Sequence, residues 1–274
     1  MTKTDWHAGF VPAMKLELLD NEKDLIFEEE HPVDKRGNWI DLLIIKNERS
    51  ISIKSAVGAI FDRFNVVEYK APGDSVNLGV FYKVLAYTSL YLKECHDYAR
   101  FGSGAFTMTI VCYSKPIRMM QQLEADGIIC TQTRARGFYE VSGCIPFKAQ
   151  IIVTSLLPPD CSWLGLLTKK ASVDKLNALV DNTVKLRNDK HREYADEVAD
   201  TFLSANIEYI RNLKEVDFDM CKAIEEIFGE EHRQEIAEKD AQISQKDAEI
   251  SRMGAKIKNM EKQIAKLQSQ IAMM

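Results

Sequence analysis

The chain lacks the patterns of a secreted, disulfide-linked or membrane protein. Its six cysteines form no Cys-x-x-Cys pair and have no histidine nearby at metal-ligand spacing. This spacing favours reduced thiols in a reducing compartment. The first residues hold no apolar signal core, and no apolar run reaches the roughly 18 residues of a membrane span. We therefore expect a cytoplasmic protein with no membrane partner.

An excess of basic residues is also missing. The chain has 36 Lys and Arg against 41 Asp and Glu, a net charge of −5. This balance does not favour nucleic-acid binding. It does not exclude an acidic metal-dependent nuclease, because a bound metal and local basic patches can recognise phosphate. The apolar fraction of 46% and the length of 274 residues suit one sizeable globular domain with an appendage, or two small domains.

Two short apolar runs organise the sequence. Residues 39–46 and 64–72 are rich in β-branched and aromatic residues and end in polar or turn residues, which predicts buried strands. Side chains alternate across a strand, so Glu68 and Lys70 share one face and Tyr69 lies on the other. If Asp41 lies on the neighbouring strand beside them, two carboxylates converge where Mg²⁺ or Mn²⁺ could bind.

The elements around these runs predict an α/β fold with a mixed central sheet. A helix over residues 6–19 is followed by a strand at 25–31, a turn, and the two strands above. A helix to about residue 94, begun at Asn77 or Ser75, then precedes a wholly apolar strand at 105–113, which suits the centre of a sheet. The order is αβββαβ. The segment 47–63 is long for a hairpin connection, so it either packs over the sheet or borders a substrate groove.

This order, with Ile40-Asp41 on one strand and Glu68-Tyr69-Lys70 on the next, resembles the PD-(D/E)XK, or restriction-endonuclease-like, nuclease superfamily. The surrounding sequence also resembles uncharacterised bacterial members related to transposase-associated proteins. Ile40 replaces the proline of the superfamily's name. The resemblance covers roughly residues 5–157.

The resemblance implies a Mg²⁺-dependent endonuclease that hydrolyses DNA phosphodiesters, with RNA as the less favoured substrate and a mobile element or defence as the setting. Asp41, Glu68 and the backbone carbonyl of Tyr69 would bind the metal. Lys70 would orient the attacking water or neutralise phosphate charge.

Accessory residues are less sharply defined. Glu17 matches a helix glutamate that family members carry near the metal, although a solvated helix carboxylate is the commoner interpretation. Lys83 is a candidate phosphate contact. Arg134 and Arg136, with Lys115 and Arg118 nearby, form the best candidate nucleic-acid patch, against the alternative of scattered surface arginines. Phe138 or Tyr139 could stack on a base there.

Beyond residue 157 the pattern is helical, at about residues 163–167, 173–187, 191–206 and 218–228. We divide the chain into a nuclease-like domain (1–157), a helical region (158–230) and a coiled coil (231–274). In the last, isoleucine recurs every seventh residue from Ile236 to Ile271, with Met or Leu at the later d positions. This heptad pattern predicts self-association as a parallel dimer.

Two alternatives to an enzyme stay open. The nuclease-like fold could be a catalytically inactive scaffold that oligomerises through its coiled coil, an interpretation that the acidic net charge favours. Alternatively, Glu68 and Lys70 could form an ordinary ion pair on a solvated face of the sheet.

Overall fold

A seven-stranded mixed sheet lies at the centre of the protein. The computed structural model describes residues 4–34, 37–95, 98–133, 135–158 and 162–214, all within one compact unit. The strand order is β1-β2-β3-β4-β7-β6-β5. The strands are β1 (Leu25–Pro32), β2 (Trp39–Lys46), β3 (Phe64–Lys70), β4 (Phe106–Cys112), β5 (Ile128–Gln132), β6 (Phe138–Gly143) and β7 (Lys148–Val153). The predicted α/β class with a mixed sheet is confirmed.

The sheet changes direction on both sides of its centre. β3, β4 and β7 are parallel, whereas β1-β2-β3 and β5-β6-β7 are antiparallel ladders. Every residue of β4 is buried, as its apolar sequence predicted for a central strand covered on both faces.

The register of β2 and β3 places the candidate site. Leu42 pairs with Val67 and Leu43 with Val66 in this antiparallel ladder. Because paired residues share a face and faces alternate along a strand, Asp41 and Glu68 lie on the Leu43–Val66 face. Tyr69 lies on the opposite face. The first condition for a shared carboxylate site is therefore met.

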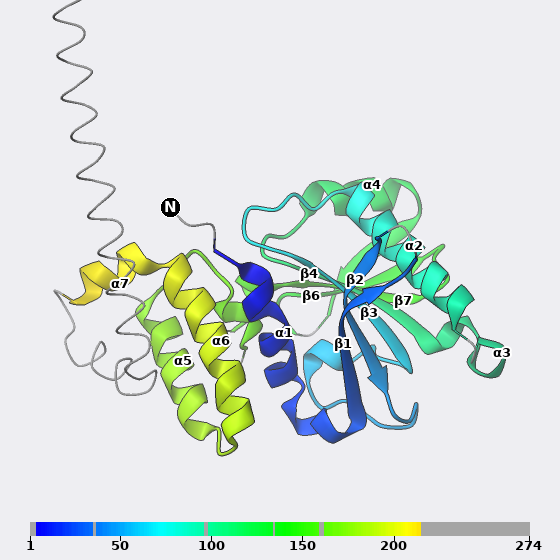
Figure 1. Cartoon of the computed structure of the whole chain (residues 1–274). Helices are drawn as coiled ribbons and strands as arrows, with labels where there is room; N and C mark the ends of the chain where they lie inside the picture. The colour runs from blue at the N-terminus through cyan, green and yellow to red at the C-terminus, as the bar shows by residue number, and fades with distance from the viewer. Residues whose placement is uncertain (1–3, 35–36, 96–97, 134, 159–161, 215–274) are drawn as a thin grey trace, which may run out of the picture. The chain divides into compact units, whose positions relative to one another are not determined.

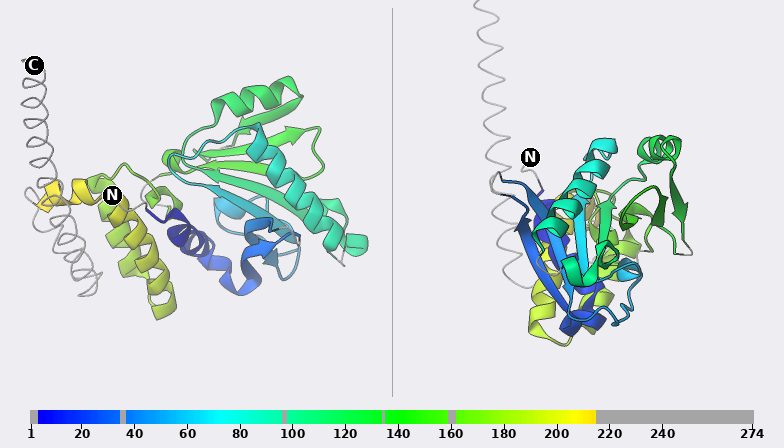
Figure 2. Two further views of the ribbon diagram at one scale, coloured as in Figure 1. Left: turned by 45° about the horizontal axis from the view of Figure 1, so that its top comes forward. Right: turned by 90° about the vertical axis from the view of Figure 1, so that its right-hand side faces the viewer.

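Helices α2 (Leu78–Glu94) and α4 (Ile117–Ala125) cover the face that carries Glu68 (Figures 1 and 2). The Asn77 side chain caps α2 by accepting a hydrogen bond from the Val80 N–H. Phe81 and Val84 of α2 pack into the core formed by the strand residues of this face. Burial of these apolar side chains fixes α2, and with it Lys83, over the end of β3.

Helix α1 (Trp6–Glu17) covers the other face and is itself covered by helices from the far end of the chain. Figure 1 shows α1 between the sheet and the pair α5 (Val173–Lys185) and α6 (Asp189–Ala205). α6 packs directly against α1, and α7 (Ile207–Lys214) follows it. The helical region thus belongs to the same compact unit as the sheet.

Short elements complete the connections. They are the 3₁₀ turns η1 (Leu19–Asp24), η2 (Ala56–Gly58), η3 (Ser103–Ala105), η4 (Thr154–Leu156) and η5 (Leu164–Leu166), and the single-turn helix α3 (Tyr98–Phe101). The segment 47–63 packs over the sheet: the Gln150 side chain of β7 donates a hydrogen bond to the Val57 carbonyl at 2.7 Å. This is one of the two roles expected for it.

The structure differs from the sequence-based expectations in four places. β5 was not predicted. The expected helix at residues 163–167 is the 3₁₀ turn η5, and α7 was missed. Phe138 and Tyr139 are 8% and 3% exposed, so the suggestion that they stack on a nucleic-acid base is wrong. The predicted helix at 218–228 and the heptads of 231–274 lie outside the described residues.

Candidate functional site

The Asp41 carboxylate lies where the β2–β3 ladder ends. The last residue pair of this ladder is Leu42 with Val67. One residue further on, Asp41 Oδ2 accepts a hydrogen bond from the backbone N–H of Tyr69 at 2.8 Å. The Asp41 carboxylate thus accepts the Tyr69 N–H in place of a backbone carbonyl of β2. This hydrogen bond fixes the carboxylate against β3 next to Glu68.

Glu68 is held by two lysines. Its Oε1 accepts a hydrogen bond from Lys70 Nζ at 2.5 Å and one from Lys83 Nζ at 2.7 Å. The Glu68 side chain is 2% exposed, while those of Lys70 and Lys83 are 21% and 36% exposed. Glu68 is therefore at the base of the cluster, and the two ammonium groups lie between it and solvent. The alternative in which Glu68 and Lys70 form an ordinary ion pair on a solvated face does not describe this geometry, because the Glu68 side chain is buried.

The pKa values of Asp41 and Lys83 are both shifted in this cluster. Burial raises the pKa of Asp41, and the nearby negative charge of Glu68 raises it further; the Tyr69 N–H, His7 and Lys83 oppose the shift. Burial lowers the pKa of Lys83, but its hydrogen bond to Glu68 and the charges of Glu68 and Asp41 outweigh burial and raise that pKa. A pair of neighbouring carboxylates in a partly buried environment is typical of functional sites.

The ring of Tyr69 supports the site from the opposite face. It stacks on Phe10 of α1 with centroids 4.3 Å apart, and the exposed His7 meets its edge at 5.5 Å. Asp5 caps α1 by accepting a hydrogen bond from the His7 N–H at 3.1 Å. His7 was not expected near the site, because nothing in a lone histidine close to the chain start indicates that α1 brings it close to Asp41.

Asp41 and Glu68 offer carboxylate oxygens, the type of donor that a hard divalent cation takes. Among the described residues no cluster of three or more His, Cys, Asp or Glu side chains gathers that could hold a metal. Two carboxylates are nevertheless adjacent, and Mg²⁺ commonly takes only one or two carboxylates, with waters and substrate phosphate oxygens completing its shell. Burial is the main cause of the raised pKa of Asp41, and the charge of Glu68 adds to it; a bound cation would offset both effects.

Glu17 lies elsewhere. Its Oε1 accepts hydrogen bonds from Ser162 Oγ at 2.6 Å and from the Leu164 N–H at 3.0 Å, which ties the end of α1 to η5. Burial raises the pKa of Glu17, and these hydrogen bonds only partly offset the effect. The structure therefore gives Glu17 a role in docking α1 against η5, away from the lysines and the Tyr69 N–H that hold the two site carboxylates.

The two candidate arginines are not both described. Arg134 lies outside the described residues, and Arg136 is exposed in the turn between β5 and β6. Nearby, Lys115 Nζ lies 4.8 Å from the ring centroid of Tyr139. The structure thus brings together Asp41, Glu68, Lys70 and Lys83, and leaves Arg136 on the surface of a separate turn.

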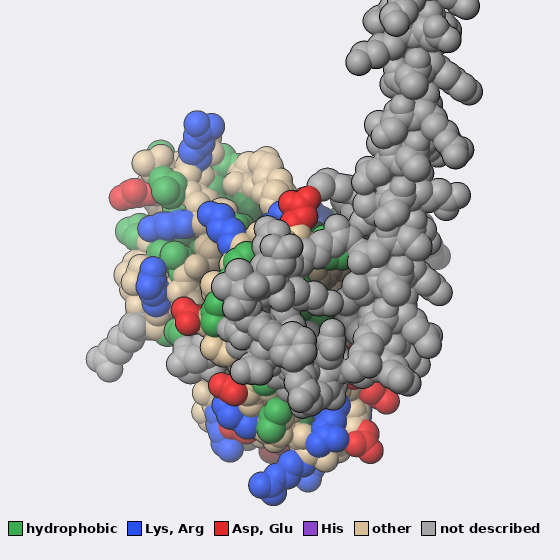
Figure 3. Space-filling view, turned by 90° about the vertical axis from the view of Figure 1, so that its left-hand side faces the viewer, with side chains coloured by type: hydrophobic (Ala, Val, Ile, Leu, Met, Phe, Trp, Pro, Cys, Tyr) green, Lys and Arg blue, Asp and Glu red, His purple; other side chains and the backbone are tan. Residues whose placement is uncertain are grey.

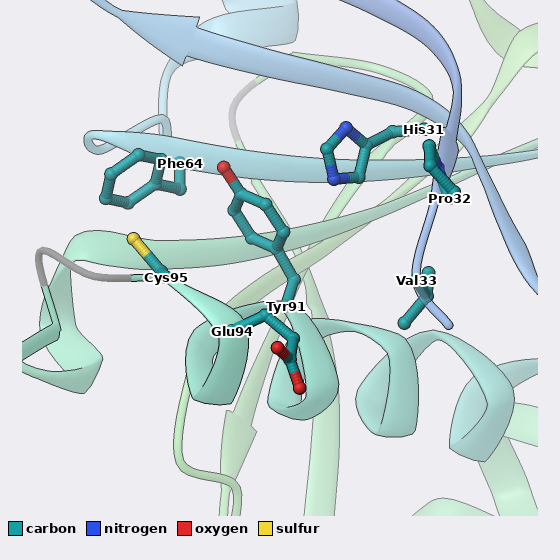
Figure 4. Close-up of a pocket in the computed structure, with 7 residues that line it drawn as sticks. All are labelled: His31, Pro32, Val33, Phe64, Tyr91, Glu94 and Cys95. Atoms are coloured by element: carbon teal, nitrogen blue, oxygen red, sulfur yellow. The ribbon is translucent and has the colours of Figure 1, made fainter. Parts of the chain in front are cut away.

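A cavity of about 400 Å³ lies at the other end of α2. Its lining is His31, Pro32, Val33, Phe64, Tyr91, Glu94 and Cys95. Figure 4 shows the Tyr91 ring rising from α2 between Phe64 and His31, whose rings meet it edge-on. His31 Nδ1 is 2.7 Å from Glu28 Oε2. The lining shares no residue with the Asp41–Glu68 cluster.

Comparison of the chain with protein-family models, with curated proteins and with solved structures gave no match. Among the described residues no helix is both long and apolar enough to cross a membrane.

Proposed function

We propose that the protein is a Mg²⁺- or Mn²⁺-dependent phosphodiesterase of the PD-(D/E)XK type that cleaves DNA. The observation that carries the proposal is the cluster at the β2–β3 junction. It places Asp41 beside Glu68 on one face of the sheet, and two lysines on the Glu68 oxygen between it and solvent. The order α1-β1-β2-β3-α2-β4 supports the same assignment.

Each residue then has a definite task. Asp41 and Glu68, with the Tyr69 carbonyl, would hold the cation, which when bound would supply charge stabilisation at the scissile phosphate and an acidified water. The Tyr69 N–H fixes Asp41. Lys70 and Lys83 lie close enough to Glu68 to place positive charge on the phosphate oxygens as negative charge develops there.

The arrangement also explains how an acidic chain can bind a polyanion. On the face seen in Figure 3, Lys and Arg side chains are interspersed with acidic and hydrophobic ones, so no single sign dominates it. Phosphate recognition would depend on the local cations of the site, because exposed charges further away are screened within about 10 Å at 0.1 M salt.

A catalytically inactive scaffold is the second candidate, and one observation favours it. Glu68 already has both lysines and Asp41 already has the Tyr69 N–H, so the charges balance without a cation. Metal binding distinguishes the two proposals.

The test combines titration with cleavage. We expect Mn²⁺ to bind the wild-type chain in isothermal titration calorimetry, and labelled double-stranded DNA to be cut when Mg²⁺ or Mn²⁺ is present. Asp41→Ala and Glu68→Gln should abolish metal binding. Lys70→Met should retain it but lower the cleavage rate by about 100-fold, which corresponds to a loss of about 2.7 kcal/mol of charge stabilisation.

The matched controls carry the same changes away from the site. Glu140→Gln on β6 and Lys93→Met at the end of α2 are exposed and should behave as wild type. Circular dichroism verifies that each variant is folded. Absence of metal binding at millimolar Mn²⁺, together with uncut DNA and RNA, would exclude the enzyme and leave the scaffold.

A further inference from the structure

A second pocket opens at the carboxyl ends of β3 and β4. It measures about 280 Å³ and is lined by Ala71, Gly73, Asp74, Val76, Tyr113, Ser114, Lys115, Pro116, Ile117 and Arg118. β3 and β4 are parallel neighbours, so the two loops that follow them meet at one edge of the sheet. Ligands of α/β proteins commonly bind in the crevice outside such strand ends.

The charges around this pocket are mostly positive. Lys115 and Arg118 are exposed members of its lining. From the connection to α5, Lys169 Nζ lies 3.8 Å from where a Cβ atom on Gly73 would stand. The only acid in the lining is Asp74, and its Oδ2 accepts a hydrogen bond from the Ala71 N–H at 2.9 Å. Three cations against one engaged carboxylate favour an anionic ligand.

The start of α4 adds donors to the same place. Pro116 is its N-cap residue; within the described residues no side chain caps this helix, and its first turn holds no acid. Pro116, Ile117 and Arg118 all line the pocket. The first N–H groups of a helix lack intrahelical partners and attract anions. Pro116 has no N–H and the Ile117 N–H donates to the Lys115 carbonyl at 3.0 Å, so Arg118 is the first lining residue of this turn whose N–H could reinforce the two basic side chains.

The pocket adjoins the proposed active site. Its lining begins at Ala71, the residue after Lys70, whose ammonium contacts Glu68. Gly73 has φ +107°, a conformation suited to glycine, and leaves the loop without a side chain at its centre. The loop follows Lys70 directly in the chain, so a phosphate next to a scissile group at Glu68 and Lys70 is the anion that we assign to it.

We infer that the pocket between the β3–α2 and β4–α4 loops binds a phosphate of the nucleic-acid strand next to the scissile one, through Lys115, Arg118 and Lys169. This inference rests on the proposed function, because it names where the substrate strand continues. The pocket sets the register of the strand, whereas Asp41, Glu68 and Lys70 act on the reacting phosphate.

The experiment measures binding apart from cleavage. A fluorescein-labelled single-stranded DNA 12-mer is titrated with the full chain in EDTA, and anisotropy is followed from 50 to 200 mM KCl. For Lys115→Ala/Arg118→Ala we expect at least about fivefold weaker binding. We expect the slope of log K against log[KCl] to fall by about 0.7 for each phosphate that the variant no longer neutralises.

The matched control is Lys93→Ala/Lys185→Ala, which removes two exposed lysines that do not line the pocket. It should keep the wild-type affinity and slope. Hydrogen exchange should show that the oligonucleotide protects residues 71–76 and 113–118 in the wild-type chain.

The outcomes separate the two proposals. Equal affinity and slope in Lys115→Ala/Arg118→Ala, or no binding by the wild-type chain, overturns the pocket, while metal-dependent cleavage by the wild type would still uphold the enzyme. Conversely, weaker binding by the variant alongside a wild-type chain that never cleaves shows that the pocket binds a nucleic-acid phosphate, but removes the nuclease and with it the assignment of that phosphate to the neighbour of a scissile one.

Discussion

Two carboxylates with raised pKa values do different work in this protein. Burial raises the pKa of both Asp41 and Glu17. Asp41 lies beside Glu68, whose charge is balanced by two lysines. Glu17 instead accepts hydrogen bonds from neutral donors, the Ser162 hydroxyl and the Leu164 N–H. The pKa shift of Asp41 thus arises from burial beside charged partners, as at many functional sites, whereas that of Glu17 arises from burial among neutral donors.

Glu17→Gln should change the pH dependence of stability. A raised pKa in the folded state means that the carboxyl of the unfolded chain ionises first, near its ordinary value of 4.5. The stability that Glu17 contributes is thus complete below that pH and is lost as pH rises through the raised pKa. Glutamine keeps an oxygen acceptor and has no such loss. Urea unfolding from pH 4 to 8 should show the wild type losing stability relative to the variant as pH rises.

The control for this series is Glu140→Gln, an exposed carboxylate of β6. It should leave the pH dependence of the unfolding free energy unchanged. A difference between wild type and Glu17→Gln that stays constant across the range would mean that Glu17 is solvated, as the simpler interpretation of the sequence held.

At the scale of elements, the docking of α1 against α6 depends on a glycine. A Cβ atom on Gly9 would lie 2.6 Å from Thr201 Oγ1 and 3.1 Å from Leu167 Cδ2. Real side chains do not approach so closely, so the two helices would have to separate or Thr201 would have to move. The Thr201 hydroxyl is also held by the Glu197 carbonyl at 3.1 Å.

We therefore expect Gly9→Ala to destabilise the protein by about 1–3 kcal/mol through overpacking. Helix propensity alone predicts the opposite sign, since alanine favours a helix by about 1 kcal/mol over glycine. Chemical denaturation decides between them. Gly104→Ala is the matched control, because among the described residues no atom lies within 4 Å of the Cβ that it would add. An unchanged or raised midpoint in Gly9→Ala would refute the close helix contact.

An element could be predicted where the local sequence carries a clear apolar pattern, and was missed where it does not. The bounds of β2 and the start of β3 follow from local β-branched runs with turn residues at their ends, and alternation within β3 placed Glu68 and Lys70 together. β5 was missed because it is a short edge strand with only one buried residue, Ile128, and so lacks an apolar pattern.

Hydrogen bonds between residues far apart in the sequence could not be predicted from local patterns. Ser162 lies 145 positions from Glu17, and no periodicity links them. Lys83 could be proposed only as a helper, because its contact with Glu68 depends on how α2 packs over β3. The Asp41 hydrogen bond to the Tyr69 N–H likewise depends on where the β2–β3 ladder ends.

At the scale of the whole molecule, a nuclease with one site cuts one strand at a time. Two copies joined by a parallel coiled coil would bring two Asp41–Glu68 sites to one DNA molecule, or would raise the affinity for it through avidity. The heptads proposed to join the copies lie within residues 231–274, outside the described residues, and rest on the isoleucine repeat of the sequence.

The repeat makes a prediction for the full chain. Ile257→Glu/Ile264→Glu places two charges at a positions, which an apolar seam cannot solvate, so the dimer should dissociate to a 31.2 kDa monomer. Asn259→Glu/Ser269→Glu adds the same charge at c and f positions on the outer surface and should remain dimeric. Sedimentation equilibrium measures both masses. If the wild-type protein sediments with the mass of a single chain, the proposed dimer and the paired cutting that depends on it are excluded. The proposal of single-strand cleavage at the Asp41–Glu68 site would be unaffected.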